Sequence, residues 1–218
     1  MTTRLPLLPL STVLVPGLVL PLHVFEPRYR VLVQALMSLP EGATRQFGVI
    51  ALRSAVRGAD PRPDLYAVGC TAELREVTPY SDGRFDIVSV GQSRFRLSQV
   101  DDDAGTPYLT GVVDLLDEPD GRENLAELTS LVVRWFARYR EQLRVEVTQL
   151  PDDPQVVSYL ITAAMVLDLP ERQRLLEIPT TADRLQAETE LLRRETALVR
   201  TFGSLPATDL THGEINAN

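Results

Sequence analysis

The 218-residue chain combines 44% hydrophobic residues with 22 basic and 30 acidic side chains, which give a formal net charge of -8 at pH 7. This composition is typical of a folded globular protein, and it argues against nucleic-acid binding, which requires a basic face. No run of about 18 uncharged apolar residues is present, so we expect no membrane span and a cytoplasmic protein. The single cysteine, Cys70, excludes an internal disulfide.

Prolines interrupt the apolar stretch from Leu5 to Arg30. Each proline fixes φ and removes a backbone donor, so this stretch predicts short extended segments joined by turns. We expect strands at Leu5–Leu8 and Leu18–Val24, then a helix that begins at Pro27 and ends before Pro40. The residues to which we assign this structural role are Pro6, Pro9, Pro16, Gly17, Pro21 and Pro27.

Alternating apolar and polar residues predict further strands along the first half of the chain. A hairpin turn at Tyr80-Ser81-Asp82-Gly83 joins two of them, because an Asp-Gly pair favours tight turns. The predicted strands are Gln46–Arg53, Ala67–Val77, Arg84–Val90, Ser93–Val100 and Tyr108–Leu116.

Helical periodicity begins after Asp117 and continues almost to the end of the chain. The pattern predicts a long amphipathic helix from Leu125 to Leu143 and a second helix capped by Asp153. A short helix at Glu171–Glu177 and a last helix that begins near Thr181 and stops at Gly203 follow.

The predicted fold class is therefore α+β, with strands and one helix first and helices afterwards. We expect a β-rich domain at residues 1–117, an α-helical domain at residues 118–203 and a disordered tail at residues 204–218.

The opening residues resemble those of the amino-terminal, substrate-binding domain of Lon proteases. The matching motifs are Leu5-Pro6-Leu7, Pro9-Leu10, Val15-Pro16-Gly17, Pro21-Leu22, Val24-Phe25-Glu26 and Arg28-Tyr29. The likeness continues more loosely to Leu175-Leu176-Glu177 and Arg184-Leu185.

This resemblance implies a PUA-like β pseudo-barrel followed by a C-terminal α-helical bundle, in a stand-alone form without the ATPase and protease domains. It also implies a non-catalytic module that recognises unfolded or apolar polypeptide segments, with polypeptide substrates or a protease or chaperone as partners. Alternatives are binding of a small ligand or RNA by the barrel and, third, a peptidase or other hydrolase. The sequence leaves the oligomeric state open.

The absence of lysine excludes two kinds of catalytic site, since all basic residues are arginines. A Walker A motif requires a lysine for the nucleotide phosphates, and a Ser-Lys dyad requires one as its base. Arginine stays protonated and replaces neither. No G-x-S-x-G elbow occurs, and one cysteine with two histidines suggests no metal site. We therefore predict no enzyme activity, no cofactor and no metal.

The candidate binding residues are Phe25, Glu26, Arg28 and Tyr29, where the second strand meets the first helix. A structural interpretation has Glu26 satisfying the amino-end donors of the helix while Arg28 pairs with a carboxylate or with carbonyls. A functional interpretation makes these residues a recognition surface with Phe25 as its apolar anchor. The two are compatible.

A second cluster joins Arg134, Arg138 and Arg140 to Trp135 and Tyr139 on the long helix. Arginines beside aromatic rings occur in nucleic-acid sites, but Glu141 and other acids share this helix. A charged outer face with a buried aromatic stripe is the simpler interpretation.

Overall fold

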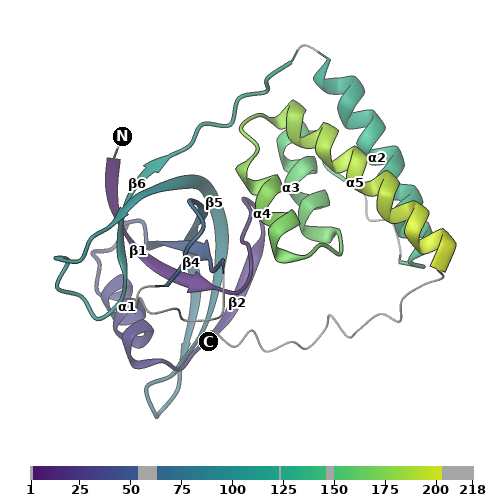
Figure 1. Ribbon diagram of the computed structural model, residues 1–218. Coiled ribbons are helices and arrows are strands. Elements are labelled where there is room, and N and C mark those ends of the chain that lie inside the picture. The colour runs from purple at the N-terminus through teal and green to yellow at the C-terminus, as the bar shows by residue number, and fades with distance from the viewer. Residues whose placement is uncertain (1, 54–62, 123, 146–149, 203–218) are drawn as a thin grey trace. The chain divides into compact units, whose positions relative to one another are not determined.

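The computed structural model describes residues 2–53, 63–122, 124–145 and 150–202 (Figure 1). The predicted tail at residues 204–218 and the predicted stop at Gly203 lie outside this range. None of the described helices is long and apolar enough to cross a membrane.

The strands are β1 (Thr2–Leu10), β2 (Val19–Val24), β3 (Gln46–Ala51), β4 (Val68–Pro79), β5 (Phe85–Val100) and β6 (Thr110–Leu115). The helices are α1 (Pro27–Met37), α2 (Leu125–Gln142), α3 (Pro154–Ala164), α4 (Leu169–Glu177) and α5 (Thr181–Phe202).

The six strands form one sheet in the order β2-β5-β4-β3-β1-β6, and β5 also pairs with β6. This extra pairing closes β5, β4, β3, β1 and β6 into a ring, with β2 added at the edge of β5. β1 and β3 run parallel, and every other pair is antiparallel. The protein is thus a mixed α+β fold, as its sequence predicts.

β1 runs through both Pro6 and Pro9 and is longer than predicted. The backbone N–H of Leu7 donates to the carbonyl of Leu109, on the β6 side, at 2.8 Å. Because successive backbone nitrogens of a strand point to opposite neighbours, the Pro6 nitrogen faces β3 and the Pro9 nitrogen faces β6. Pairing with β3 starts only at Leu7, and pairing with β6 ends at Pro6. Neither proline therefore removes a bond that the sheet needs.

The two predicted turns are present. Leu18 donates to the carbonyl of Val15 at 3.2 Å, and Gly17 has a φ of 79°, as the third residue of a type II turn requires. In the hairpin, Tyr80 donates to Arg84 at 2.9 Å and Gly83 has a φ of 82°.

One prediction in this part of the chain is wrong, because the strands expected at Arg84–Val90 and Ser93–Val100 are a single strand, β5. Gly91, which we placed between them, lies inside β5 and donates its N–H to Leu18 at 2.9 Å. A Cβ at Gly91 would collide with the carbonyl of Val15. The glycine therefore permits a close approach of two backbones without breaking the strand.

α1 packs its apolar face against the strands. Its side chains at Tyr29, Leu32, Val33 and Leu36 join a cluster with Leu22, Phe47, Ile87 and others from β1 to β5. A smaller cluster of Leu5, Leu7, Ile50, Phe95 and Val113 lies on other positions of the ring. Both clusters are buried, and because they use alternate positions of β1 and β3 they lie on opposite faces of the sheet.

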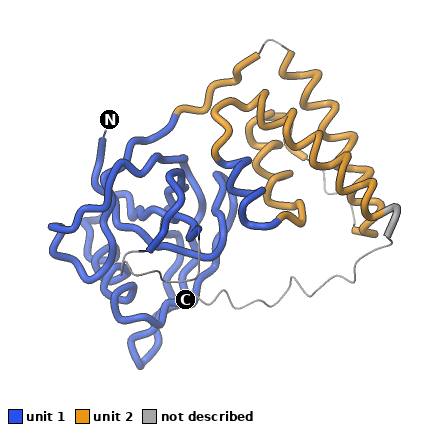
Figure 2. The backbone as a smooth tube through the Cα atoms, viewed as in Figure 1, with its two compact units in different colours: residues 1–116, 168–176, 214–218 blue, residues 117–167, 177–213 orange. Residues whose placement is uncertain are grey.

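The described residues pack into two compact units (Figure 2). The first contains residues up to Leu116 together with Asp168–Leu176, and the second contains Asp117–Leu167 and the residues from Glu177 onward. The segment that contains α4 was predicted to lie with the other helices, and the structure corrects this. Two buried side chains explain the difference: Gln173 Nε2 donates to the carbonyl of Val68 at 2.9 Å, and Arg94 donates to the carbonyl of Leu176 at 2.9 Å.

The second unit buries the apolar faces of α2, α3 and α5 against one another, and α2 and α5 run side by side (Figure 1). Asp153 caps α3 as predicted, since its carboxylate accepts from the N–H of Val156 at 2.9 Å. Polar groups are also buried there: Glu188 Oε1 accepts from Ser158 at 2.8 Å and from Thr162 at 2.7 Å, and the Arg184 guanidinium lies 3.9 Å from the ring centroid of Tyr159.

Candidate functional site

The junction between β2 and α1 positions the candidate residues. β2 ends at Val24, and Glu26 adopts extended backbone angles, φ -64° and ψ 132°, before Pro27 begins the helix. The fixed φ of Pro27 suits the first helical position, where a backbone N–H would have no helical partner. The side chains of residues 25 and 26 are thus held at a fixed corner of the first unit.

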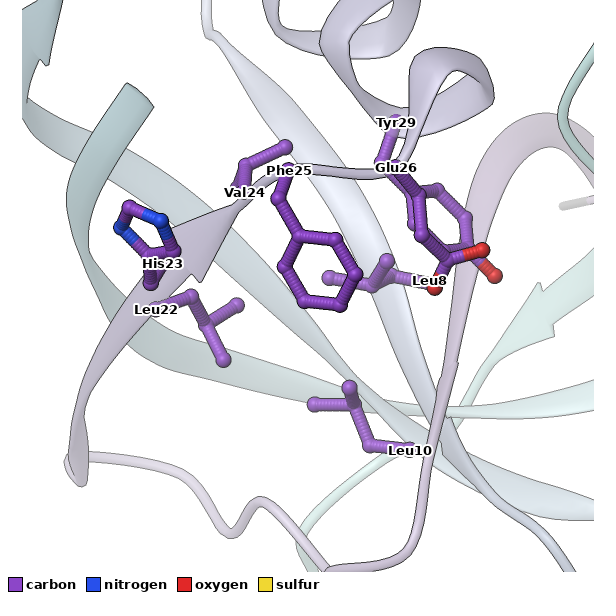
Figure 3. Close-up of a pocket in the computed structure, with 8 residues that line it drawn as sticks. All are labelled: Leu8, Leu10, Leu22, His23, Val24, Phe25, Glu26 and Tyr29. Atoms are coloured by element: carbon purple, nitrogen blue, oxygen red, sulfur yellow. The ribbon is translucent and has the colours of Figure 1, made fainter. Parts of the chain in front are cut away.

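A small pocket opens at this corner. Its apolar wall comes from β1 and β2, and its remaining wall comes from the corner and the first turn of α1 (Figure 3). The pocket has a volume of about 20 Å³, little more than a single water molecule needs. The lining residues are Leu8, Leu10, Leu22, His23, Val24, Phe25, Glu26 and Tyr29.

Phe25 is central to this pocket. Its ring lies between Leu22 and His23 on one side and Glu26 and Tyr29 on the other (Figure 3). The side chain nevertheless remains 39% exposed, a large fraction for an aromatic residue surrounded by leucines. The His23 ring stacks on it with the two centroids 6.3 Å apart.

Glu26 pairs with Arg28 but does not cap α1. Arg28 donates to Glu26 Oε2 from Nε at 2.9 Å and from a terminal nitrogen at 2.8 Å, which confirms the predicted pairing with a carboxylate. The predicted capping role is wrong, because no side-chain bond to the helix end forms and the Glu26 carbonyl accepts from Tyr29 and Arg30 instead. Glu26 Oε1 is buried and has no hydrogen-bond partner among the described residues.

Tyr29 forms the inner wall and is only 4% exposed. Burial raises the pKa of its phenol to about 12, so it stays neutral at physiological pH. The Arg28 guanidinium lies 4.5 Å from the Tyr29 ring centroid, which places Arg28 beside the pocket and outside its lining. Of the four predicted residues, Phe25, Glu26 and Tyr29 therefore line the pocket, and Arg28 contacts Glu26 and Tyr29 from outside it.

Sequence reasoning missed a polar cluster next to Phe25. Asp86 accepts from the Tyr80 hydroxyl at 2.5 Å and from His23 Nδ1 at 2.6 Å, and Arg84 donates to His23 Nε2 at 3.3 Å. These partners fit the neutral tautomer that carries its proton on Nδ1. The hydrogen bond from Tyr80, then that from His23, lowers the pKa of Asp86. The hairpin signal at Tyr80 and the outward position of His23 on β2 were the clues in the sequence.

No serine, threonine or cysteine lines the pocket, and its one side-chain hydroxyl is the phenol of Tyr29, which burial keeps neutral. Cys70 is buried elsewhere and bonds through Sγ to the carbonyl of Thr71 at 3.4 Å. Within the described ranges, no group of three or more histidine, cysteine or acidic side chains could hold a metal ion. What the site offers is an apolar surface with one unsatisfied acceptor.

Comparison with known proteins places this fold among Lon proteins. The chain is 31% identical over 205 residues to Lon protease 2 of Herpetosiphon aurantiacus and 28% identical over 208 residues to Lon protease 2 of Myxococcus xanthus. These alignments cover 89% and 90% of this chain but 24% of each relative, so the chain spans about a quarter of their length.

Two solved structures agree with this. A Lon N-terminal domain protein from Xanthomonas campestris superposes with a TM-score of 0.62 at 25% identity, covering 88% of this chain and 98% of that one. The N-terminal domain of a Mycobacterium avium complex Lon protease, at 18% identity and a TM-score of 0.64, covers 89% and 98% and shares the fold. The family model for the ATP-dependent protease La (LON) substrate-binding domain matches residues 4–194, and the chain belongs to this family.

Proposed function

We propose that this protein is a non-catalytic module that recognises unfolded or apolar polypeptide segments through the pocket at Phe25. The observation that carries the proposal is the 39% exposed Phe25 ring above an apolar pocket whose wall holds a buried, unpartnered Glu26 oxygen. The family supports it too, because its model describes a substrate-binding domain. The segments bound here would be substrates of a protease partner.

The mechanism follows from the size of the pocket. In this conformation it accommodates no more than a water-sized group, so an apolar side chain enters when Phe25 turns aside and packs against it. Burying such a side chain is favourable by roughly 1.5–3 kcal/mol before the cost of ordering the peptide. A donor next to that side chain would satisfy Glu26 Oε1, which otherwise remains an unpaired buried acceptor.

The proposal therefore predicts a preferred ligand, an extended peptide in which an apolar residue adjoins an arginine or lysine. A Gly/Ser-rich peptide that carries a single Leu-Arg pair is the probe, and the same peptide with Leu-Glu is its control. Titration followed by two-dimensional amide NMR should shift the resonances of residues 22 to 29 with Leu-Arg and shift them less with Leu-Glu.

Two variants test the site itself. Phe25→Ala should weaken binding by about tenfold or more, since it removes the aromatic contact at the centre of the site. Val31→Ala is the matched control, because Val31 is an exposed apolar residue of α1 that does not line the pocket. Equal affinity of the Phe25→Ala variant and the parent protein would refute this site, and no shift with either peptide would refute the recognition of apolar segments.

The architecture that the family resemblance implies belongs to the same proposal. We propose that the closed ring of strands is a PUA-like pseudo-barrel and that the helices form a bundle domain. The ring of β5, β4, β3, β1 and β6 and the shared apolar core of α2, α3 and α5 support these assignments.

A further inference from the structure

The second unit contains a cavity that takes no part in the proposed peptide recognition. It lies between α2 and α5, has a volume of about 580 Å³, and is lined by Trp135, Arg138, Glu141, Gln142, Arg193 and Thr196, among others. We call it the α2–α5 cavity. Its volume lies within the range of small-molecule sites in proteins.

Two guanidinium groups at the cavity have no acidic partner within the described ranges. Arg138 and Arg193 lie 5.0 Å and 5.2 Å from the ring centroid of Trp135, and neither forms an ion pair with any described residue. Several other surface arginines of this chain behave differently, since Arg28, Arg84, Arg122 and Arg194 each contact a carboxylate within 2.9 Å. The indole ring thus holds two positive charges at the cavity while leaving their N–H donors available to an anion.

The wall of the cavity also contains unsatisfied polar atoms. Thr196 is 8% exposed, and its hydroxyl has no hydrogen-bond partner in the described part of the chain. The same is true of Gln142 Oε1, which is buried in the cavity wall. Buried polar groups without partners cost free energy and are uncommon in folded proteins. A ligand that accepts from Thr196 and donates to Gln142 would remove both deficits.

The charges decide which ligand fits. Arg138 and Arg193 are positive and Glu141 is negative, so the lining favours an oxyanion at the arginines and a hydrogen-bond donor toward Glu141 and Gln142. We propose that the α2–α5 cavity binds a small molecule through a carboxylate or phosphate group held by Arg138 and Arg193. This site lies on other elements than the Phe25 pocket and does not depend on the proposed peptide recognition.

The single tryptophan of the chain makes the test direct, because Trp135 lines the cavity and is the sole source of indole fluorescence. The full chain is titrated with inorganic phosphate, pyrophosphate, succinate and glutamate at constant ionic strength, with sodium chloride as the blank. We expect a saturable fluorescence change with a dissociation constant on the order of 1 mM. A response to phosphates only, to carboxylates only or to both supports the site and identifies the source of the oxyanion.

Variants distinguish the cavity from general charge effects. Arg138→Gln and Arg193→Gln should each weaken binding by about tenfold or more, because a charged hydrogen bond is lost. Arg134→Gln, an exposed arginine of α2 outside the cavity lining, should bind as the parent protein does. The proposal is overturned if no probe gives a saturable change, or if the Arg138→Gln and Arg193→Gln variants bind as tightly as the parent.

Discussion

Burial determines what individual charged residues do in this protein. Glu26 and Arg28 pair at a partly exposed corner, whereas Glu188 is fully buried between α3 and α5. Glu188 receives two hydrogen bonds on Oε1, but its Oε2 has no partner among the described residues. Loss of solvation is therefore only partly compensated, and burial raises the pKa of Glu188 to about 8 despite the neighbouring Thr162 and Arg184.

This pKa predicts a pH-dependent stability. The folded state keeps a proton that the unfolded state, with an ordinary pKa of 4.5, has released, so the free energy of unfolding falls as pH rises from about 4.5 to about 8. The slope from this group approaches about 1.4 kcal/mol per pH unit. Glu188→Gln keeps an acceptor for Ser158 and Thr162 but cannot ionise, so its stability should fall less over the same window.

Urea unfolding at several pH values, followed by Trp135 fluorescence, measures this difference within the helical unit. Glu190→Gln is the control, since it changes an exposed glutamate on the same helix. An unchanged pH slope in the Glu188→Gln variant would mean that Glu188 is ionised in the folded protein.

At the scale of elements, most boundaries follow from local patterns. α1 begins at Pro27 and α3 at Pro154, where a proline suits the first turn, and the first half of β5 alternates between buried and less buried residues. Gly91 is the exception, because a glycine that permits close packing has the same local appearance as one that ends a strand. Only the proximity of the Val15 carbonyl distinguishes the two cases.

A pair of glycine variants tests this explanation. Gly91→Ala forces a Cβ against the rigid backbone at Val15 and should lower the free energy of unfolding by roughly 2 kcal/mol or more. Gly111→Ala meets the side chains of Leu7 and Leu97 and no backbone atom, and because side chains adjust more readily than backbone it should cost less. Urea unfolding followed by circular dichroism compares them, and an equal or smaller loss for Gly91→Ala would contradict the close-approach role.

The candidate site shows the same division between local and long-range information. The sequence identified Phe25, Glu26, Arg28 and Tyr29 because they are adjacent at a strand-to-helix junction. It did not identify Leu8 and Leu10 as lining residues or Asp86 and Tyr80 as neighbours of His23, because these residues are brought there by strand pairing. The pairing of β2 with β5 sets His23 opposite Asp86.

For the whole molecule, the path of the chain is the main feature that local patterns do not contain. The chain leaves the strands after Leu116, forms α2 and α3, returns to the first unit with α4, and then forms α5 in the second unit. The division into a β-rich domain at residues 1–117 and a helical domain at residues 118–203, each folding by itself, therefore remains a proposal. Any single cut near residue 117 would separate α4 from the unit in which it packs.

The contacts of α4 predict which of the two units loses stability when they are removed. Gln173→Ala leaves the buried Val68 carbonyl without its donor and should lower the stability of the first unit by about 1–3 kcal/mol. Hydrogen exchange should accelerate in β4 and β5 and remain unchanged in α2 and α5. Arg174→Ala, an exposed neighbour on α4, is the control and should alter neither unit. Faster exchange confined to α2 and α5 would contradict this assignment.

The sequence by itself determined the α+β class, the element order and the position of the corner at Phe25, because proline and glycine act on local backbone geometry and periodic apolar residues mark buried faces. Its lack of lysine also led to the prediction that it holds no lysine-dependent catalytic site. The tertiary structure decided the closure of the sheet, the continuity of β5, the return of α4 through Gln173 and Arg94, and the grouping of Arg138, Arg193 and Trp135. Each of these depends on contacts between residues far apart in the chain, which no local pattern encodes.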